Sequence, residues 1–368
     1  MWQHAHSWLH DLVPYEPGKP IEDVARELGL RTGDIIKLAS NENPLGPSPK
    51  AVEAMQRAAA SAHVYPDGGC YYLREALATK HGLKRENMVI GNGSNEIIEL
   101  MGHGFLSPGR QVITADHAFV VYKLMATLFG AETVEVADPN FIHDLPAMAQ
   151  AVTPHTRQLF VANPNNPTGT IVEPAALDAL VEAVPEEVIL IFDEAYYEFL
   201  PKPPDLLKYV REGRPNVMVL RTFSKVQGLA FLRVGYGMAA TSLIEVLQRT
   251  RQPFNINGMA QAAALAALDD DEHIQKSVSL VTEERAKLEQ ALAQRELEYV
   301  PSHANFVLVK VGDGDAVFKA LLQKGVIVRA MRGYKLPEWI RVTVGRPHEN
   351  QRFLEELDAL NLVAACPA

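Results

Sequence analysis

A lysine with two hydroxyl-bearing neighbours lies at residues 221–225, where the sequence reads Arg-Thr-Phe-Ser-Lys. Thr222 and Ser224 precede Lys225, and Arg233 follows soon after. Lysine amines form Schiff bases with carbonyl groups, while hydroxyls and an arginine bind phosphate. The spacing is therefore typical of a lysine that holds an aldehyde cofactor whose phosphate binds to the neighbouring residues. For the Ser-Lys pair alone, a surface lysine in a loop is the simpler interpretation. Motifs elsewhere in the chain are needed to choose between a surface lysine and a cofactor-binding one.

Three consecutive apolar runs, each predicted to be a buried strand, end in polar residues that include Asn166, Asp193 and Lys225. In a parallel sheet the carboxyl ends of the strands meet at one edge, so these side chains are expected to share a crevice. Asp193 directly follows an unbroken apolar run, and a semi-buried carboxylate needs a cation or a donor. A pyridinium nitrogen is such a partner. Asp193 would keep it protonated, while Asn166 and Tyr196 would hydrogen-bond the ring hydroxylate.

A Gly-Asn-Gly turn supplies further donors for the phosphate. It follows a predicted strand and leads into a predicted helix at Ser94 and Asn95, whose backbone amides would bind an anion. Thr222, Ser224 and Arg233 are expected to complete this site, with Arg233 as the counter-charge.

Other ligand motifs fit the chain less well. The turn beginning at Gly91 lacks the third glycine of the dinucleotide fingerprint. The Gly-x-Gly-x-x-Ala at residues 235–240 lies inside an apolar run with no strand-and-turn unit before it. The sequence has no Walker-type Gly-Lys-Ser/Thr and no His-Glu-x-x-His. His4, His6 and His10 form an isolated N-terminal trio of a kind that is more often solvated, so no metal site is predicted.

Composition narrows the classes of protein and partner. A chain of 368 residues has room for roughly two domains. A net charge of −10 argues against nucleic acid and anionic membranes as partners, although small anionic substrates need only a few local arginines. No apolar run is long enough to span a membrane and no signal-peptide pattern occurs, so a cytoplasmic location is predicted. Cys70 and Cys366 are the only cysteines, which excludes a disulfide framework.

The alternation of short apolar runs with amphipathic helices predicts an α/β fold with a largely parallel sheet covered on both faces. The runs expected to be strands are residues 88–90, 111–114, 133–136, 158–161, 188–192 and 217–220. A smaller α+β domain is expected to follow, with helices at 260–268, 274–288 and 353–360 and strands at 306–309, 326–328 and 340–344. The predicted division is an N-terminal arm over 1–37, which packs on the small domain or a partner subunit, a large cofactor-binding domain over 38–245 and a small domain over 246–368.

Together, the motifs Asn-Pro-Thr-Gly, Asp-Glu-Ala-Tyr and Thr-Phe-Ser-Lys resemble those of the fold-type I pyridoxal-phosphate-dependent aminotransferases. Within that family the chain is similar to the histidinol-phosphate aminotransferases over nearly its whole length. The segments that carry this likeness are residues 38–44, 65–67, 93–96, 253–257 and 340–345. The resemblance implies a large domain with a mostly parallel seven-stranded-type sheet, a smaller α+β domain, pyridoxal 5'-phosphate as cofactor, and a homodimer whose subunits share the active site.

The resemblance also implies roles for single residues. Lys225 would carry the cofactor and move the proton between the two substrate-derived carbons, with Asp193 and Tyr196 completing the catalytic set. Phe119 would stack on the cofactor ring, although the sequence fits a core aromatic equally well. Tyr65 would reach the cofactor phosphate of the other subunit.

Substrate binding is assigned in the same way. Arg341 would anchor the anionic group of the substrate, with Asn166 beside it, and Arg329 and Tyr15 would help to bind the substrate phosphate. The apolar neighbours of Arg341 on either side favour a functional arginine over a solvated one. Arg332 competes for the role of Arg329.

The predicted reaction is the transfer of an amino group between L-histidinol phosphate and 2-oxoglutarate, a step of histidine biosynthesis. An aromatic amino acid aminotransferase shares nearly all these motifs and remains an alternative. A pyridoxal-phosphate-dependent amino acid phosphate decarboxylase fits less well.

Overall fold

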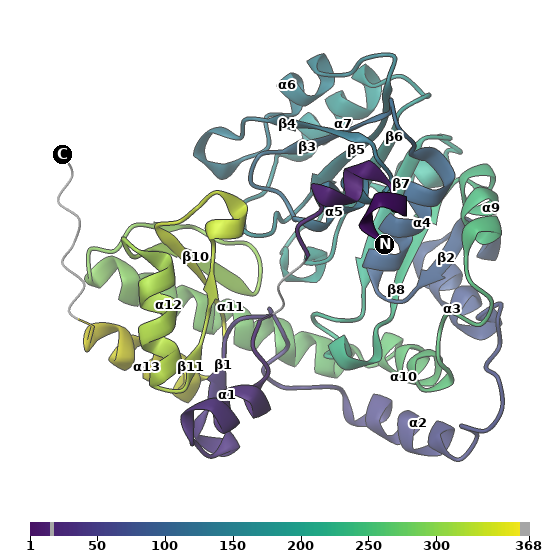
Figure 1. The fold of residues 1–368 in the computed structure, drawn as a ribbon. Coiled ribbons are helices and arrows are strands. Elements are labelled where there is room, and N and C mark those ends of the chain that lie inside the picture. The colour runs from purple at the N-terminus through teal and green to yellow at the C-terminus, as the bar shows by residue number, and fades with distance from the viewer. Residues whose placement is uncertain (15–17, 361–368) are drawn as a thin grey trace.

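The computed structural model describes residues 1–14 and 18–360, which form a large lobe built on one sheet and a smaller lobe beside it (Figure 1). The large sheet has seven strands in the order β2-β8-β7-β6-β5-β3-β4. Their bounds are β2 Met88–Gly91, β3 Gln111–Ala115, β4 Glu132–Val136, β5 Thr156–Ala162, β6 Ile189–Asp193, β7 Val217–Thr222 and β8 Gly235–Ala239. All strands predicted between residues 88 and 220 form, and the predicted α/β fold with its mostly parallel seven-stranded sheet is confirmed.

Strand β8 was not predicted. It pairs antiparallel with β2 and β7, whereas β3 to β7 pair in parallel. Its Gly-x-Gly pattern serves close packing, because a Cβ on Gly235 would lie 2.5 Å from the Ser94 amide nitrogen. The glycines thus let the start of α4 approach the sheet.

Both faces of the large sheet are buried, because its central strands carry runs of apolar side chains that point to both sides. Leu190 and Phe192 of β6 join one hydrophobic core, while Ile189 and Ile191 join the core on the opposite face. One face is covered by α4 Ser94–Phe105, α5 Val121–Leu128 and α9 Thr241–Thr250. The other is covered by α3 Tyr71–His81, α6 Leu145–Gln150, α7 Pro174–Ala183, α8 Leu207–Arg211 and α10 Gly258–Leu268.

The small lobe has a four-stranded sheet in the order β12-β13-β10-β9 and a two-stranded pair, β1-β11. The strands are β1 Ile36–Lys37, β9 Tyr299–Val300, β10 Phe306–Lys310, β11 Val326–Ile327, β12 Arg329–Ala330 and β13 Trp339–Thr343. The helices are α11 Asp271–Gln294, α12 Gly314–Gln323 and α13 Pro347–Asp358. Val281 of α11 packs with Tyr196 of the large lobe and Phe306 of the small lobe, so this helix joins the two.

The N-terminal region contacts both lobes. Helix α1, Ile21–Leu28, packs through Val24 against Leu322 and Ile327 of the small lobe, and it ends at Gly29 in the left-handed conformation. Farther upstream, the Trp8 indole donates a hydrogen bond of 3.2 Å to the Leu128 carbonyl at the end of α5.

The domain boundaries at residues 37 and 245 stay predictions. Helix α10 follows the second boundary and packs on α2, Pro49–Ala59, beside the large-lobe core. Short 3-10 helices complete the described chain, at Trp2–His4, Ser7–His10, Thr32–Asp34, Arg85–Asn87, Pro139–Phe141, Tyr197–Phe199, Ala230–Leu232 and Arg332–Tyr334. Among the described residues, none of the helices is both long and apolar enough to cross a membrane.

Candidate active site

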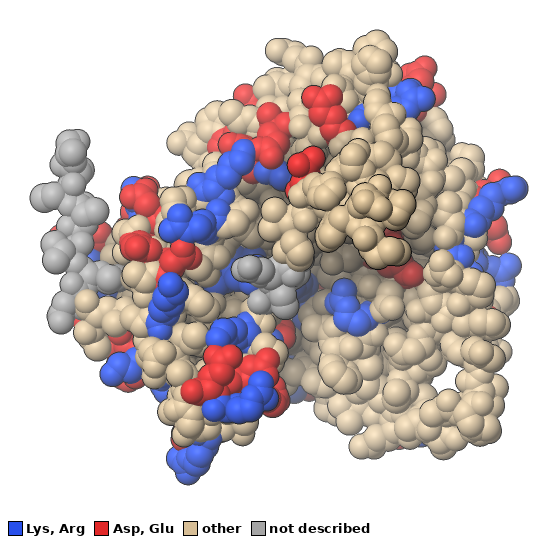
Figure 2. Space-filling view, in the orientation of Figure 1, with Lys and Arg blue, Asp and Glu red and all other residues tan. Residues whose placement is uncertain are grey.

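A cavity of about 760 Å³ opens at the carboxyl ends of β5, β6 and β7, where the two lobes meet. Basic side chains lie around the hollow between the lobes, while acidic and basic side chains mix over the small lobe (Figure 2). The predicted site residues that line this cavity are Ser94, Asn95, Phe119, Asn166, Asp193, Tyr196, Thr222, Ser224, Lys225, Arg233, Arg329 and Arg341. The fold therefore brings most of the predicted set to one place.

Asp193 ends β6 and is buried, with two neutral donors on its carboxylate. The Tyr122 hydroxyl donates to Oδ2 at 2.7 Å, and the Ala195 amide donates to Oδ1 at 3.1 Å. Burial raises the pKa of Asp193, while these hydrogen bonds and the charge of Lys225 act to lower it. A cationic ring nitrogen is the partner that a carboxylate in this setting needs.

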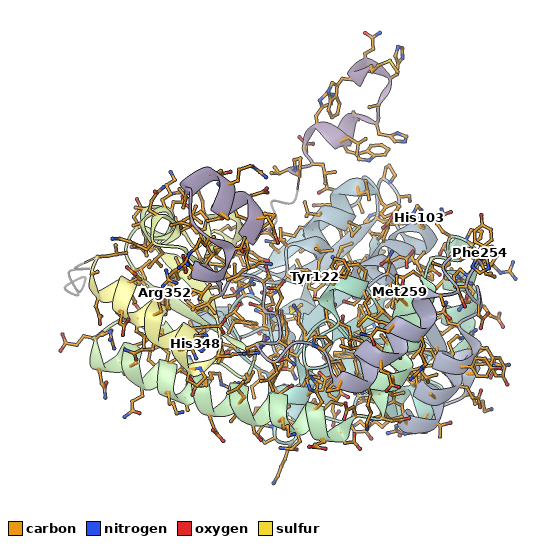
Figure 3. The ribbon with its side chains drawn as sticks, turned by 90° about the horizontal axis from the view of Figure 1, so that it is seen from below. His103, Tyr122, Phe254, Met259, His348 and Arg352 are labelled. Atoms are coloured by element: carbon orange, nitrogen blue, oxygen red, sulfur yellow. The ribbon has the colours of Figure 1, made fainter. Side chains whose placement is uncertain are left out.

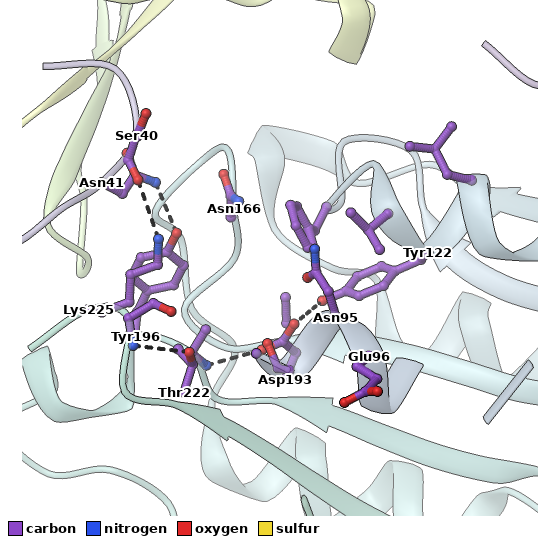
Figure 4. Close-up of a pocket in the computed structure, with 18 of the residues that line it drawn as sticks. Ser40, Asn41, Asn95, Glu96, Tyr122, Asn166, Asp193, Tyr196, Thr222 and Lys225 are labelled. Atoms are coloured by element: carbon purple, nitrogen blue, oxygen red, sulfur yellow. Dashed lines mark hydrogen bonds between the residues drawn. The ribbon is translucent and has the colours of Figure 1, made fainter. Parts of the chain in front are cut away.

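Lys225 lies just beyond β7, with its Nζ directed into the cavity (Figure 4). Nζ donates to the Ser40 carbonyl at 3.4 Å and lies 5.3 Å from the centre of the Tyr196 ring. Lys225 lines the same cavity as Asp193 and Asn166, so its amine is placed to react with a carbonyl group held there.

The Tyr196 hydroxyl accepts a hydrogen bond of 2.9 Å from Asn41 Nδ2. Burial raises the pKa of Tyr196 to about 12, although Arg341 and the hydrogen bond from Asn41 act to lower it. The phenol therefore keeps its proton at neutral pH and can donate a hydrogen bond into the cavity.

One corner of the cavity lies where α4 begins. Gly93 has φ +77°, and a Cβ there would lie 2.6 Å from Arg233 Nη2, so glycine is what admits the guanidinium. Arg233 itself adopts φ +53°, and within the described part of the chain no side chain caps the N-terminus of α4. The buried Ser224 Oγ has no hydrogen-bond partner among the described residues. An arginine, a buried unpartnered hydroxyl and an uncapped helix N-terminus together suit a phosphate.

These features fit the cofactor predicted from the sequence. The phosphate corner, the buried carboxylate of Asp193 and the amine of Lys225 match the phosphate, ring nitrogen and aldehyde of pyridoxal 5'-phosphate.

On the small-lobe side of the cavity, Arg341 of β13 is buried. Its guanidinium donates to Asn166 Oδ1 and, at 2.9 Å, to the Ala39 carbonyl, while its Nε has no hydrogen-bond partner among the described residues. Arg329 of β12 lies opposite Arg341 in register and also lines the cavity. Arg332 instead pairs with Asp315 outside it. The geometry thus favours Arg329 over Arg332 for contact with an anion.

Two predicted residues are not among those found to line this cavity, for different reasons. Tyr15 lies outside the described residues. Tyr65 is 80% exposed and stacks on Phe254, with 4.8 Å between ring centres. Phe254 lies at the end of the molecule far from His348 and Arg352 of the small lobe (Figure 3). The role of Tyr65 in a second subunit stays a prediction.

Sequence reasoning missed several residues of the site. Tyr122 contacts Asp193 across 71 positions of sequence, and Asn41 contacts Tyr196 across 155. Tyr122 has the position of a core aromatic on an amphipathic helix, which hides its polar role. The only available signal at Asn41 is its place in a polar, turn-rich loop.

A buried ion pair next in sequence to the site residues was also missed. Arg221 of β7 and Glu194, directly after β6, lie 2.8 Å apart, and the Arg221 guanidinium lies 3.6 Å from the Tyr197 ring centre. Arg221 precedes the cavity residue Thr222, and Glu194 follows the cavity residue Asp193. The ion pair therefore links the ends of β6 and β7 that carry the site.

Comparisons with known proteins agree with this geometry. Residues 33–357 match the family of class I and II aminotransferases. The chain is 53% identical to the histidinol-phosphate aminotransferase of Akkermansia muciniphila, covering 96% of this chain and 97% of that protein. It is 50% identical to the enzyme of the same name from Moorella thermoacetica, covering 94% and 90%. The crystal structure of histidinol-phosphate aminotransferase from Sinorhizobium meliloti in complex with pyridoxal-5'-phosphate is 26% identical, with a TM-score of 0.86 and coverage of 97% and 100%.

Proposed function

This chain belongs to the class I and II aminotransferases, and on that premise we propose that it transfers an amino group between L-histidinol phosphate and 2-oxoglutarate. The observation that carries the proposal is the convergence of Asn166, Asp193 and Lys225 from three neighbouring strand ends on one cavity with arginines at its far side. Relatives named for this reaction, about half identical over nearly the whole chain, support the choice of substrate.

Pyridoxal 5'-phosphate, when bound, supplies an aldehyde for the substrate amine and a ring that withdraws electrons from the substrate carbon. Lys225 Nζ would hold it and move the proton at the reacting carbon. Asp193 would keep the ring nitrogen protonated, because a buried carboxylate favours a cation beside it. Asn166 and Tyr196 would bind the ring oxygen, and Phe119 would stack on the ring.

The phosphate would lie in the corner at the start of α4. The backbone amides of Ser94 and Asn95 would donate to it, together with the hydroxyls of Thr222 and Ser224 and the guanidinium of Arg233. The unpartnered Ser224 hydroxyl supports this assignment, because a buried hydroxyl without a partner is costly.

The arginines that line the cavity favour an amino donor and an amino acceptor that both carry negative charge. Arg341 would bind a carboxylate or the phosphate of the donor, and Arg329 and Tyr15 would assist with the phosphate. L-histidinol phosphate and 2-oxoglutarate are both anionic, so the same guanidiniums serve in turn.

We also propose that two copies form a homodimer with a shared active site and that the protein acts in the cytoplasm. The exposed stack of Tyr65 on Phe254 supports the first point, because an exposed aromatic pair is typical of an interface.

An amino-donor panel tests the reaction. Purified protein with pyridoxal 5'-phosphate and 2-oxoglutarate is expected to form glutamate with L-histidinol phosphate, and much more slowly with phenylalanine. Lys225→Ala serves as the inactive control. A preference for phenylalanine would indicate an aromatic aminotransferase, and carbon dioxide release without 2-oxoglutarate would indicate a decarboxylase.

A further inference from the structure

We infer that Asn41 is a positioning residue that fixes the Tyr196 hydroxyl as a hydrogen-bond donor toward the cofactor ring, and that Thr343 of the small lobe fixes Asn41 in turn. The inference rests on the cofactor site proposed above. It does not depend on which amino donor the enzyme uses.

The segment that contains Asn41 contacts three functional side chains in succession, and Figure 4 shows the contacts of Ser40 and Asn41. The Ala39 carbonyl accepts from Arg341 at 2.9 Å, the Ser40 carbonyl accepts from Lys225 at 3.4 Å, and Asn41 Nδ2 donates to Tyr196 at 2.9 Å. Only Asn41 among the three makes its contact through its side chain. It is therefore the position where a substitution changes a single contact to the site.

Hydrogen-bond directions around Asn41 follow from donor and acceptor chemistry. The Asn41 backbone amide donates to Thr343 Oγ1 at 2.9 Å, so the Thr343 hydroxyl proton is left for Asn41 Oδ1, 3.1 Å away. With Oδ1 occupied in this way, the amide nitrogen of Asn41 faces Tyr196. Because the Tyr196 oxygen accepts this bond, the Tyr196 hydroxyl proton is left to donate to another acceptor. Tyr196 lines the cavity, so an acceptor on a bound cofactor can receive it.

The backbone holds Asn41 rigidly in this position. Asn41 has φ +55°, in the left-handed region that asparagine tolerates better than most residues. Asn305 Nδ2 donates to the Asn41 carbonyl at 3.0 Å, and the Thr343 amide donates to the Leu38 carbonyl at 2.8 Å. Asn41 and Tyr196 are 1% and 4% exposed, so water does not replace a lost contact without cost.

The consequence is a change in the proton affinity of the bound cofactor. A hydroxyl that donates to the ring oxygen favours the negatively charged oxygen and so lowers the pH midpoint of the cofactor absorbance. The charged groups that face Tyr196 are Lys225, Asp193 and Arg341, and none of them is altered in the variants below.

The test is a pH titration of cofactor absorbance in the loaded enzyme without substrate. Tyr196→Phe removes the donor and is expected to raise the midpoint by roughly 1 pH unit. Asn41→Asp tolerates the same backbone and offers an acceptor that turns the Tyr196 proton away, so a similar rise is expected. Asn41→Gly, which adds no charge, should raise the midpoint by a smaller amount.

Two comparisons separate positioning from general disruption. In the Tyr196→Phe background, Asn41→Asp should move the midpoint by less than half of its effect in the wild-type protein, because the hydroxyl it acts through is gone. Thr343→Val should raise the midpoint, whereas Thr343→Ser, which keeps the hydroxyl, should retain the wild-type value.

The outcomes are distinguishable. Equal shifts from Asn41→Asp in both backgrounds, or no shift from Thr343→Val, would overturn the role of Asn41 and leave the proposed function standing. If Tyr196→Phe itself leaves the midpoint unchanged, both the inference and the assignment of Tyr196 to the cofactor fail.

Discussion

Asp193 lines the cavity at a position that suits cofactor binding but lowers the stability of the cofactor-free protein. Its carboxylate is buried between neutral donors, an arrangement that costs free energy unless a cation is added. The residue is therefore better suited to binding the cofactor than to stabilising the empty protein.

Asp193→Asn tests this conflict. The substitution keeps an oxygen that accepts from Tyr122 and removes the charge, so activity should fall at least about 100-fold. Thermal unfolding of the cofactor-free protein should show unchanged or higher stability, because a buried charge is removed. Loss of stability with full activity would show that Asp193 is structural.

Site residues were predictable from the sequence where a polar side chain closely follows an apolar strand. Asn166, Asp193 and Lys225 each follow an apolar strand, and parallel strands bring their ends together by topology. Tyr122, Ser40 and Asn41 were missed because their contacts depend on how distant segments pack, which no local spacing encodes.

At the scale of elements, strands β6 and β7 are held at their carboxyl ends by the pair of Glu194 and Arg221. Both side chains are almost fully buried, so neither charge has water as a substitute partner. The pair contributes to the register of the strand ends that carry Asp193 and Thr222.

Removing one partner should be costly. Glu194→Ala leaves Arg221 buried without its counter-charge and is expected to lower the free energy of unfolding by about 3–5 kcal/mol. Chemical denaturation measures this effect. The exposed pair of Lys276 and Glu272 is the matched control, and Lys276→Ala should leave the free energy of unfolding nearly unchanged. Equal effects at the two pairs would contradict the assignment.

A second contact between elements joins the two lobes. Lys335, after the last 3-10 helix, binds Asp116 at 2.6 Å and also pairs with Glu135 of β4. Burial acts to raise the pKa of Asp116, but the hydrogen bonds, from Lys335 above all, outweigh it and lower the pKa from 3.8 to about 2.

Because the pKa of Asp116 is lowered in the folded protein, the contribution of this contact to the free energy of unfolding depends on pH. The contact stabilises the fold above pH 3.8, and its contribution is lost as the pH falls through about 2. Asp116→Asn should therefore lower the free energy of unfolding by about 1 kcal/mol at neutral pH, after allowance for solvent screening. The difference from wild type should shrink in acid. A difference that stays constant down to pH 2 would exclude the ion pair as its cause.

The elements themselves were largely predictable. Strands with unbroken apolar runs and helices with a regular apolar face were found, because periodicity reports burial directly. Strand β8 was missed because its glycines resemble a ligand-binding turn, and their packing role against Ser94 appears only in three dimensions.

For the whole molecule, the proposed shared site predicts that two inactive variants complement each other. Lys225→Ala and Tyr65→Ala alter the same site from opposite subunits, so a mixed dimer regains one intact site. Unfolding and refolding the mixture should restore on the order of a quarter of wild-type activity. Activity no greater than that of the separate variants would contradict a site shared through Tyr65.

The two-lobed architecture followed from the change in pattern along the chain, whereas the second subunit did not. Tyr65 lies on the surface of a single chain, and only resemblance to a family suggested where it acts.

The most direct test of the account is a half-reaction followed by cofactor absorbance. L-Histidinol phosphate added to the loaded enzyme without 2-oxoglutarate should deplete the aldehyde form of the cofactor, because the amino group stays on the enzyme. Later addition of 2-oxoglutarate should restore the original spectrum, and Lys225→Ala should show neither change. A spectrum that L-histidinol phosphate leaves unaltered, while phenylalanine depletes it, would contradict the proposed function.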